Sequence, residues 1–255
     1  MIVRSDNFAA LGPIAKTTIL ISVVFFFVFV GEADAQRRFS RTYPTGQKVR
    51  LELTNRTGTV TVEGWNRQEI GISASLEAPA ATIVPQNLSS TIVSNVLRDN
   101  QGREVGNVNF TIRVPYNAEV DIETRIGNLK ITSVRSAYVR AHISSEGDIE
   151  LTSIVAKAVS AENGLGDIFF DGEIIDGGNY RFSSMRGNIN LRIPFSSAFK
   201  LVATAPSTRY ISLGEFANAN MSVVGNGRRV VGQTGGGNAT LTVTNQQGTI
   251  RFFGR

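Results

Sequence analysis

The chain of 255 residues contains no cysteine, one histidine and one tryptophan. The absence of cysteine excludes disulfide bonds, thiolate metal sites, a cysteine nucleophile and a lipid-modified N-terminus. The single histidine, His142, excludes a histidine-rich metal site, and a catalytic triad would have to be built around this one ring. His142 lies between the apolar residues Ala141 and Ile143. We therefore interpret it as an outward-facing surface residue of a strand.

Long apolar runs are also scarce, and the one that exists lies near the N-terminus. Residues 17–30 are predominantly apolar, Lys16 precedes them, and the small residues Ala33 and Ala35 follow. A spanning helix needs about 20 residues, so this run of 14 predicts a secretory signal peptide over residues 1–35 that is cleaved after Ala35. The alternative is an uncleaved N-terminal anchor, the only membrane contact we expect. Export would place the protein in the periplasm, on the cell surface or outside the cell.

Past the leader, strand periodicity dominates and helical periodicity is nearly absent. Residues 49–53, 60–62 and 108–114 place apolar side chains at every second position. This alternation is typical of half-buried strands. Prolines fall between such runs and not inside them. We therefore predict one all-β domain over residues 46–255.

Two segments depart from this pattern. Residues 36–45 carry three arginines; we expect a solvated N-terminal tail, although its charge could also contact an anionic envelope surface. Residues 79–107 contain prolines, serines and an Asp-Asn-Gln-Gly turn around a small apolar patch. We expect an irregular insertion there that forms a strand pair, with a short amphipathic helix over residues 88–97 as the alternative.

A short turn sequence, Gly followed by Asn or Asp and then Ile or Leu, recurs through the middle of the chain. Its glycines are Gly127, Gly147, Gly166 and Gly187, which are 20, 19 and 21 residues apart. A period near 20 is typical of stacked repeats in which each unit covers the core of its neighbour. The sequence thus predicts a β-solenoid-like stack of two-strand repeats of about 20 residues in a single elongated domain. Gly58 and Gly248 are expected to serve the same turn.

Glycine is expected at this turn because the backbone needs a positive φ angle or a close approach between coils. The residues that follow these glycines would form a row along the stack: Asn128, Asp148, Asp167 and Asn188. We interpret the row as a structural ladder that caps the turns. A weak cation site and an acid–base pair of Asp148 and Asp167 are the alternatives. We expect no catalytic residues, no metal ligands and no cofactor.

Aromatic residues could form either a core or a carbohydrate-stacking strip, and we favour the core for residues at strand spacing. Gly235–Gly237 lack the Lys-Ser/Thr ending of a phosphate loop and are expected to form a turn. The aromatic residues weighed are Trp65, Phe169, Phe170, Phe182, Phe195 and Phe199.

The ordered set of turns resembles a known family. The early Val60–Trp65 segment, the serial Gly-Asn/Asp-Ile/Leu turns, Gly225–Arg229 and the closing Gln247–Ile250 are similar to the DUF4097 family of bacterial β-strand-repeat proteins, described as putative adhesins. The similarity covers about residues 46–253. It implies a β-solenoid-like fold and an exported location, and it supplies no catalytic residues.

These observations favour an exported, non-catalytic protein that presents a rigid surface, as an adhesin or envelope scaffold. Its partner would be an envelope or extracellular protein or a polysaccharide. The export signal and the lack of a basic helix argue against nucleic acid. The alternatives are a carbohydrate-active enzyme that uses stacked carboxylates, and an envelope stress or signalling component whose activity resides in a partner.

Overall fold

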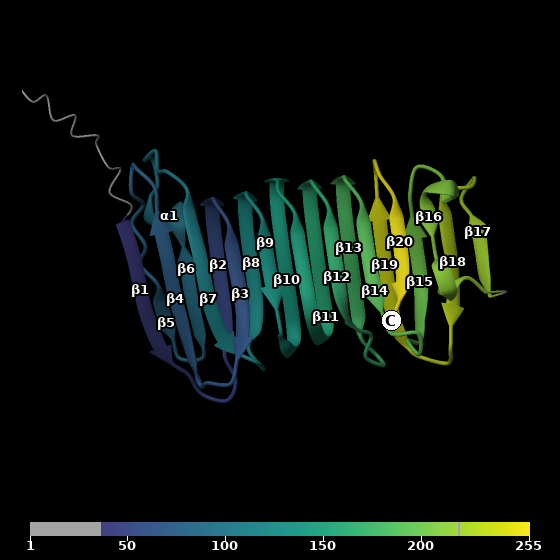
Figure 1. The fold of residues 1–255 in the computed structure, drawn as a ribbon, viewed down its shortest axis with the longest axis horizontal. Helices are drawn as coiled ribbons and strands as arrows, with labels where there is room; N and C mark the ends of the chain where they lie inside the picture. The colour runs from purple at the N-terminus through teal and green to yellow at the C-terminus, as the bar shows by residue number, and fades with distance from the viewer. Residues whose placement is uncertain (1–36, 219) are drawn as a thin grey trace, which may run out of the picture. The chain divides into compact units, whose positions relative to one another are not determined.

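The computed structural model describes residues 37–218 and 220–255, which belong to one compact unit, Asp34–Arg255. The predicted signal peptide lies outside the described residues. The described chain is all-β and solenoid-like, as the sequence predicts (Figure 1). Within it, no helix has the length and apolar character that crossing a membrane requires.

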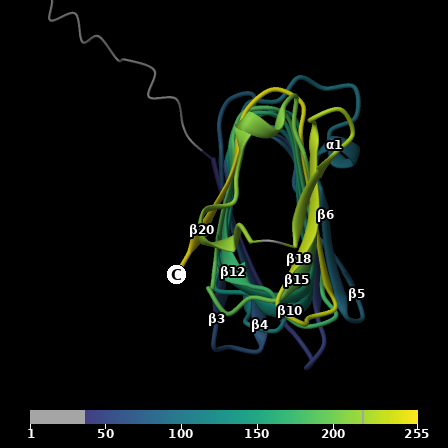
Figure 2. The ribbon, with the colours of Figure 1, turned by 90° about the vertical axis from the view of Figure 1, so that its right-hand side faces the viewer.

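The strands form two facing walls around one core, as the end view shows (Figure 2). We call them wall A and wall B. In order along the stack, wall A contains β5 (Gln86–Leu88), β6 (Thr91–Asn95), β2 (Arg50–Thr57), β8 (Glu119–Ile126), β10 (Arg135–Glu146), the second half of β11 (Ile149–Leu165), β13 (Asn179–Arg186), β19 (Ala239–Asn245), β15 (Phe199–Thr204), β18 (Arg229–Thr234) and β17 (Met221–Val224).

Wall B is built in the same way. In order along the stack it contains β1 (Arg37–Pro44), β4 (Glu69–Leu76), β7 (Val108–Pro115), β3 (Val60–Trp65), β9 (Leu129–Thr132), the first half of β11, β12 (Ile168–Glu173), β14 (Ile189–Ile193), β20 (Ile250–Gly254) and β16 (Ile211–Ser212). Three short helices complete the described chain: α1 (Val96–Asp99), η1 (Thr208–Tyr210) and η2 (Gly214–Phe216).

Alternation of apolar and polar residues decides which side chains enter the core. In β8, Val120 and Ile122 are fully buried between the walls, while Glu119 and Asp121 face outward. The strands in the middle of both walls pair in parallel, so equivalent residues stack on one another along the core. This stacking gives each of these middle strands a hydrogen-bonded neighbour on both sides.

The order of the coils in the stack differs from their order in the chain. In the chain, the last turn, at Gly248, lies 61 residues beyond Gly187, or about three periods of 20 residues. In the stack, β19 and β20 pair directly with β13 and β14, and β15 and β16 pair on the far side of β19 and β20. The chain therefore runs past the position of its last coil, forms the end of the stack, and returns to fill the gap.

The two segments that depart from the repeat both contribute strands. Residues 37–44 form β1, which pairs antiparallel with β4 along its whole length, so the expected tail is a strand. Within residues 79–107, β5 and β6 form the expected strand pair. The segment is less irregular than predicted, since β6 continues wall A beside β2 and buries Ile92. The helical alternative is wrong over residues 88–95; only α1 is helical, and the Asn95 side chain caps it.

Tyr180 of β13 is the largest of the fully buried side chains in the described core. Its hydroxyl donates to the carbonyl oxygen of Ala156 at 2.8 Å and accepts from the N–H of Ile175 at 2.7 Å. Burial raises the pKa of this phenol. The hydroxyl thus bonds to two backbone groups, of which the Ala156 carbonyl belongs to a buried residue.

Tyr180→Phe is expected to lower the free energy of unfolding by about 1–3 kcal/mol, because both backbone groups lose their partner. Tyr138→Phe, on the outer side of wall A, is the control and is expected to change it by less than about 0.5 kcal/mol. Urea denaturation measures both. The unfolded phenol ionises near pH 10 and the folded one at higher pH, so wild-type stability falls above about pH 10. Tyr180→Phe should lose less stability there, and an equal loss would contradict the assignment.

Candidate functional site

The six turn glycines lie in one column along the edge between the walls. All have positive φ angles between 112° and 152°. A Cβ atom added to Gly127, Gly147, Gly166, Gly187 or Gly248 would overlap the carbonyl group of the glycine in the neighbouring coil, and at Gly58 it would overlap the carbonyl of Val108. The turn therefore combines both features that favour glycine, a left-handed backbone and a close backbone approach.

The residues after these glycines form a hydrogen-bonded ladder. The side-chain oxygen of Asn128 accepts from the N–H of Asp148 at 2.9 Å, and that of Asp148 accepts from the N–H of Asp167 at 2.8 Å. Asp167 accepts from the N–H of Asn188 at 2.7 Å, and Asn188 accepts from Thr249. Each side chain thus bonds to the next coil, whereas the sequence suggested a cap on its own turn. The ladder joins neighbouring coils.

A second row of polar side chains, which sequence reasoning missed, lies inside the same corner. Asn163 donates to the carbonyl oxygen of Gly147, Ser184 to that of Gly166, and Asn245 to that of Gly187. These three side chains are buried, and each precedes a turn glycine by three positions. Asparagine, threonine or serine precedes all six glycines at this spacing. That regularity is the signal that could have identified the row.

The ladder uses its side-chain oxygens on backbone amides, which disfavours the cation site considered from the sequence. In the described part of the chain, no group of three or more His, Asp or Glu side chains is placed to hold a metal ion. Asp148 and Asp167 each direct one carboxylate oxygen to a backbone N–H group. The geometry therefore favours a structural role for both residues.

Millimolar calcium is expected to leave the melting temperature of the protein within about 1 °C of its value in chelator, because residues 37–218 and 220–255 place no group of three His, Asp or Glu side chains to hold the ion. Asp148→Asn, which keeps the accepting oxygen, should behave like wild type. A calcium-dependent rise of several degrees that Asp148→Asn abolishes would contradict the structural role.

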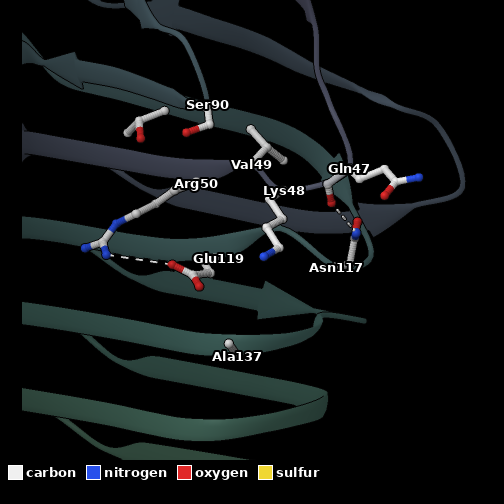
Figure 3. A pocket seen from close by; sticks show the side chains of 9 residues that line it. Gln47, Lys48, Val49, Arg50, Ser90, Asn117, Glu119 and Ala137 are labelled. Carbon is white, nitrogen blue, oxygen red and sulfur yellow. Dashed lines mark hydrogen bonds and ion pairs between the residues drawn. The ribbon is translucent and has the colours of Figure 1, made fainter.

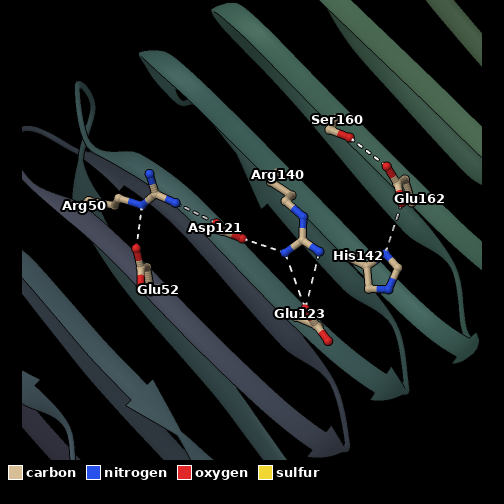
Figure 4. Close-up of polar contacts among 8 residues, drawn as sticks. All are labelled: Arg50, Glu52, Asp121, Glu123, Arg140, His142, Ser160 and Glu162. Carbon is tan, nitrogen blue, oxygen red and sulfur yellow. Dashed lines mark hydrogen bonds and ion pairs between the residues drawn. The ribbon is translucent and has the colours of Figure 1, made fainter. Parts of the chain in front are cut away.

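Polar side chains on the outer side of wall A form a connected array (Figure 4). Arg50 of β2 contacts Glu52 at 2.8 Å, Glu119 at 3.8 Å and Asp121 at 2.7 Å. Arg140 of β10 contacts the other oxygen of Asp121 at 2.9 Å and Glu123 at 3.4 Å. We call these residues the arginine–carboxylate array: Arg50, Glu52, Glu119, Asp121, Glu123 and Arg140.

The array fixes its side chains in defined positions. Burial alone would lower the pKa of Arg140, but the hydrogen bonds and charges of Asp121 and Glu123 outweigh it and raise the pKa. Burial, followed by the negative charge of Asp121, raises the pKa of Tyr138. The Arg50 guanidinium lies over the Tyr138 ring at 5.2 Å. Both arginines therefore orient the carboxylates between them.

His142 lies beside the array, but its contacts are not those of a catalytic base. Its Nδ1 atom is 3.7 Å from Glu162, and Ser160 donates to the same carboxylate at 3.3 Å (Figure 4). A triad needs the serine hydroxyl to bond to the histidine and the carboxylate to orient the ring from the other side. Here both residues converge on Glu162. The side chain of His142 is half-buried, so it is less exposed than the sequence suggested.

A hollow of about 400 Å³ opens at the edge of the array (Figure 3). Arg50 and Glu119 belong to both, and the exposed Ala137 leaves a gap between longer side chains. The Asn117 side chain donates to the carbonyl oxygen of Gln47 at 2.7 Å, which ties two loops of the rim together. The hollow is lined by Gln47, Lys48, Val49, Arg50, Ser90, Thr91, Asn117, Glu119 and Ala137. Such a lining suits a polar ligand that both donates and accepts hydrogen bonds.

The aromatic residues weighed from the sequence divide between core and surface. Phe170, Phe182 and Phe199 are fully buried, as expected for core residues. Phe195 is 59 % exposed because it follows the end of β14 and lies against Gly254. Trp65 and Phe169 are half-buried on the outer side of wall B, and Gly235 and Gly236 lie in a turn, as predicted.

Comparison with known proteins places the chain in a family. The model of a family described as Toastrack DUF4097 matches residues 44–252, which is most of the chain. The chain belongs to the Toastrack DUF4097 family. The resemblance seen in the ordered turns is therefore confirmed, and the Toastrack fold accounts for the solenoid-like stack. The comparison with curated proteins finds no match.

Three solved structures resemble this Toastrack chain. A "putative cell adhesion protein" from Clostridium sporogenes ATCC 15579 has a TM-score of 0.50 and 12 % identity, over 85 % of this chain and 97 % of the other. A "putative adhesin" from Bacteroides fragilis NCTC 9343 has a TM-score of 0.33 and 11 % identity, over 86 % and 99 %. A "putative lipid binding protein" from Parabacteroides distasonis ATCC 8503 has a TM-score of 0.39 and 9 % identity, over 86 % and 98 %. The first shows a shared fold alone; the TM-scores of the other two are too low to support a conclusion.

Proposed function

We propose that this Toastrack protein is an exported, non-catalytic binding protein, an adhesin or envelope scaffold. It presents the outer side of wall A to an envelope or extracellular protein or polysaccharide. The observation that carries the proposal is the polar hollow beside the arginine–carboxylate array, because it combines an open cavity with side chains held in place. Preorganised polar groups lose little conformational entropy on binding.

The stack supports this role mechanically. Two-strand units of about 20 residues, joined at the glycine column, would hold every outward side chain on a hydrogen-bonded strand. Outer residues of such a stack can vary without disturbing the core. The array spans three neighbouring strands, β2, β8 and β10, so a partner would meet a surface whose charges keep their spacing. Such fixed charges contribute specificity more than affinity.

The enzymatic alternative is weaker. An acid–base pair needs two carboxylates whose oxygens face a substrate, but Asp148 and Asp167 each bond to a backbone amide of the next coil. In the array, Asp121 binds an arginine through each of its two oxygens. A role in envelope stress or signalling would place the activity in the partner, and it would use the same binding surface.

Retention of the purified protein on envelope material from its own cells tests the proposal. Ala137→Trp should fill the hollow from an exposed position and lower the bound fraction at least about fivefold. Lys157→Trp is the matched control, because residue 157 occupies the equivalent exposed position on the neighbouring strand and does not line the hollow. It should bind like wild type.

Two results would contradict the proposal. One is recovery of all the wild-type protein in the unbound fraction, and the other is binding of Ala137→Trp as strong as that of wild type. Thermal melting of both variants establishes that each is folded, since both substitutions lie outside the core.

A further inference from the structure

A second concave surface lies on the outer side of wall B, at the end of the stack that β1 forms. Two adjoining hollows of about 400 and 300 Å³ share Ser40, Ser73 and Thr111. These residues come from β1, β4 and β7, which are neighbouring strands (Figure 1). We call the joined hollows the wall B groove. It is separate from the arginine–carboxylate array, which lies on wall A.

The groove exists because β4 carries small outward residues between two strands with longer ones. Gly71, Ser73 and Ser75 face outward from β4. They lie opposite Arg113, Thr111 and Asn109 of β7 and opposite Thr42, Ser40 and Arg38 of β1. Short side chains on the middle strand leave a trough along its length. Hydroxyl, amide and guanidinium groups therefore line the trough.

The charge of the groove is of one sign. Arg38 and Arg113 face it, and no aspartate or glutamate lines it. Arg41 lies on the core-facing side of β1, with its guanidinium over the Phe39 ring. Within residues 37–218 and 220–255, Arg38 forms no ion pair, and Arg113 contacts Glu63 through Nε at 3.3 Å. The hollow on wall A differs, because Glu119 lines it and pairs with Arg50. The wall B groove thus attracts an anion.

The indole ring of Trp65 closes one end of the groove and is held in place. The Trp65 indole N–H donates to the carbonyl oxygen of Glu69 at 2.9 Å. The guanidinium groups of Arg67 and Arg113 lie 4.9 and 5.7 Å from the ring centre, and an added Cβ at Gly71 would touch the ring edge. The indole therefore holds Arg113 in place as a cation–π partner.

We propose that the wall B groove binds a short acidic oligosaccharide. Carboxylate groups of the sugar pair with Arg38 and Arg113, because a guanidinium binds a carboxylate with charge-assisted hydrogen bonds. Sugar hydroxyls bond to Ser40, Ser73 and the other hydroxyl groups along the trough. This site requires no contribution from wall A and does not depend on the function proposed for it.

Other anions fit the groove less well. Single-stranded nucleic acid needs exposed aromatic faces on which bases stack, whereas the Trp65 ring is already packed against two arginines. A lipid headgroup would be followed by acyl chains, but the outward residues of β1, β4 and β7 at the groove are polar or small. A chain of hydroxylated, carboxylated rings matches both the charge and the hydrogen-bonding groups.

Calorimetry with the purified protein tests the proposal, with a galacturonic acid hexamer as the probe and its methyl ester as the uncharged control. The acid should bind and the ester should bind at least about tenfold more weakly. Raising the salt concentration should weaken binding of the acid. Absence of binding by the acid, or equal binding of acid and ester, would overturn the proposal.

Variants then locate the site. Ser73→Tyr should fill the trough from an exposed position and weaken binding at least about tenfold, and Arg38→Glu should weaken it by reversing one charge. Thr61→Tyr, on the same row of wall B but outside the groove, is the matched control and should bind like wild type. Unchanged binding by both Ser73→Tyr and Arg38→Glu would overturn the assignment. Retention on vesicles of phosphatidylglycerol without binding of the hexamer would also overturn it.

The same titration separates this site from the one on wall A. Ala137→Trp should leave hexamer binding unchanged, and Ser73→Tyr should leave retention on wall A's partner unchanged. If Ala137→Trp abolished hexamer binding, the hexamer would bind on wall A and the wall B assignment would fail.

Discussion

Gly147→Ala is expected to lower the free energy of unfolding by at least about 4 kcal/mol, or to prevent folding, which is the range reserved for severe local conflicts. Gly147 has a φ angle of 145°, and an alanine Cβ would overlap the carbonyl group of Gly127 in the neighbouring coil. Relief would require the coils to move apart, which would break the hydrogen bonds from Gly147 N to Leu165 O and from Gly127 N to Glu146 O. Urea denaturation followed by circular dichroism measures the change.

Gly177→Ala is the matched control for this prediction. Gly177 also has a positive φ angle, of 70°, but no atom lies within 4 Å of an added Cβ. Its substitution should lower the free energy of unfolding by only about 1–2 kcal/mol, which is the cost of a left-handed backbone for a residue with a Cβ atom. The difference between the two variants measures the close contact between coils together with the larger φ angle of Gly147. Equal losses would show that backbone conformation alone explains the recurring glycine.

Phe170→Ala is expected to lower the free energy of unfolding by about 3–5 kcal/mol, the range for removing a buried aromatic ring. Phe170 of β12 is fully buried, and its ring lies 5.0 Å from that of Phe182 and 6.4 Å from that of Tyr180. These three rings fill the core between the walls in neighbouring coils. Their removal leaves a cavity that the paired strands cannot close.

Phe169→Ala tests whether position within the strand, and not aromatic content, decides this effect. Phe169 precedes Phe170 but faces outward and is half-buried, with Arg192 over its ring at 5.7 Å. Its removal should cost less than about 1.5 kcal/mol. A loss equal to that of Phe170→Ala would contradict the inward and outward assignment in β12. Chemical denaturation of both variants decides the matter.

The central part of the fold was predictable from the sequence because each turn repeats a local requirement. The regular spacing of the glycines predicts a turn that needs a positive φ angle and close stacking of the coils. Glycine meets both needs at Gly127, Gly147, Gly166 and Gly187. The position of Gly248 was not predictable. Its coil lies directly on that of Gly187, although β15 to β18 separate the two coils in the chain.

The site residues also divide into those that the sequence could predict and those that it could not. The buried row at Asn163, Ser184 and Asn245 could have been found, because each residue precedes a turn glycine by three positions. The array and the hollows could not have been found from the sequence. Arg50 and Asp121, which form an ion pair, are 71 positions apart in the sequence. The composition of residues 36–45 is that of a solvated tail, so it did not predict the pairing of β1 with β4.

Oxidative footprinting of the protein bound to envelope material tests most directly whether the outer side of wall A is the binding surface. Hydroxyl radicals modify accessible aromatic, histidine and methionine side chains. Tyr138 and His142 lie at the array, whereas Phe253 is 44 % exposed on wall B, at the far end of the stack from β1. The account predicts that bound envelope material reduces modification of Tyr138 and His142 and leaves Phe253 unchanged. Unchanged modification of Tyr138 and His142 in the bound protein would contradict it.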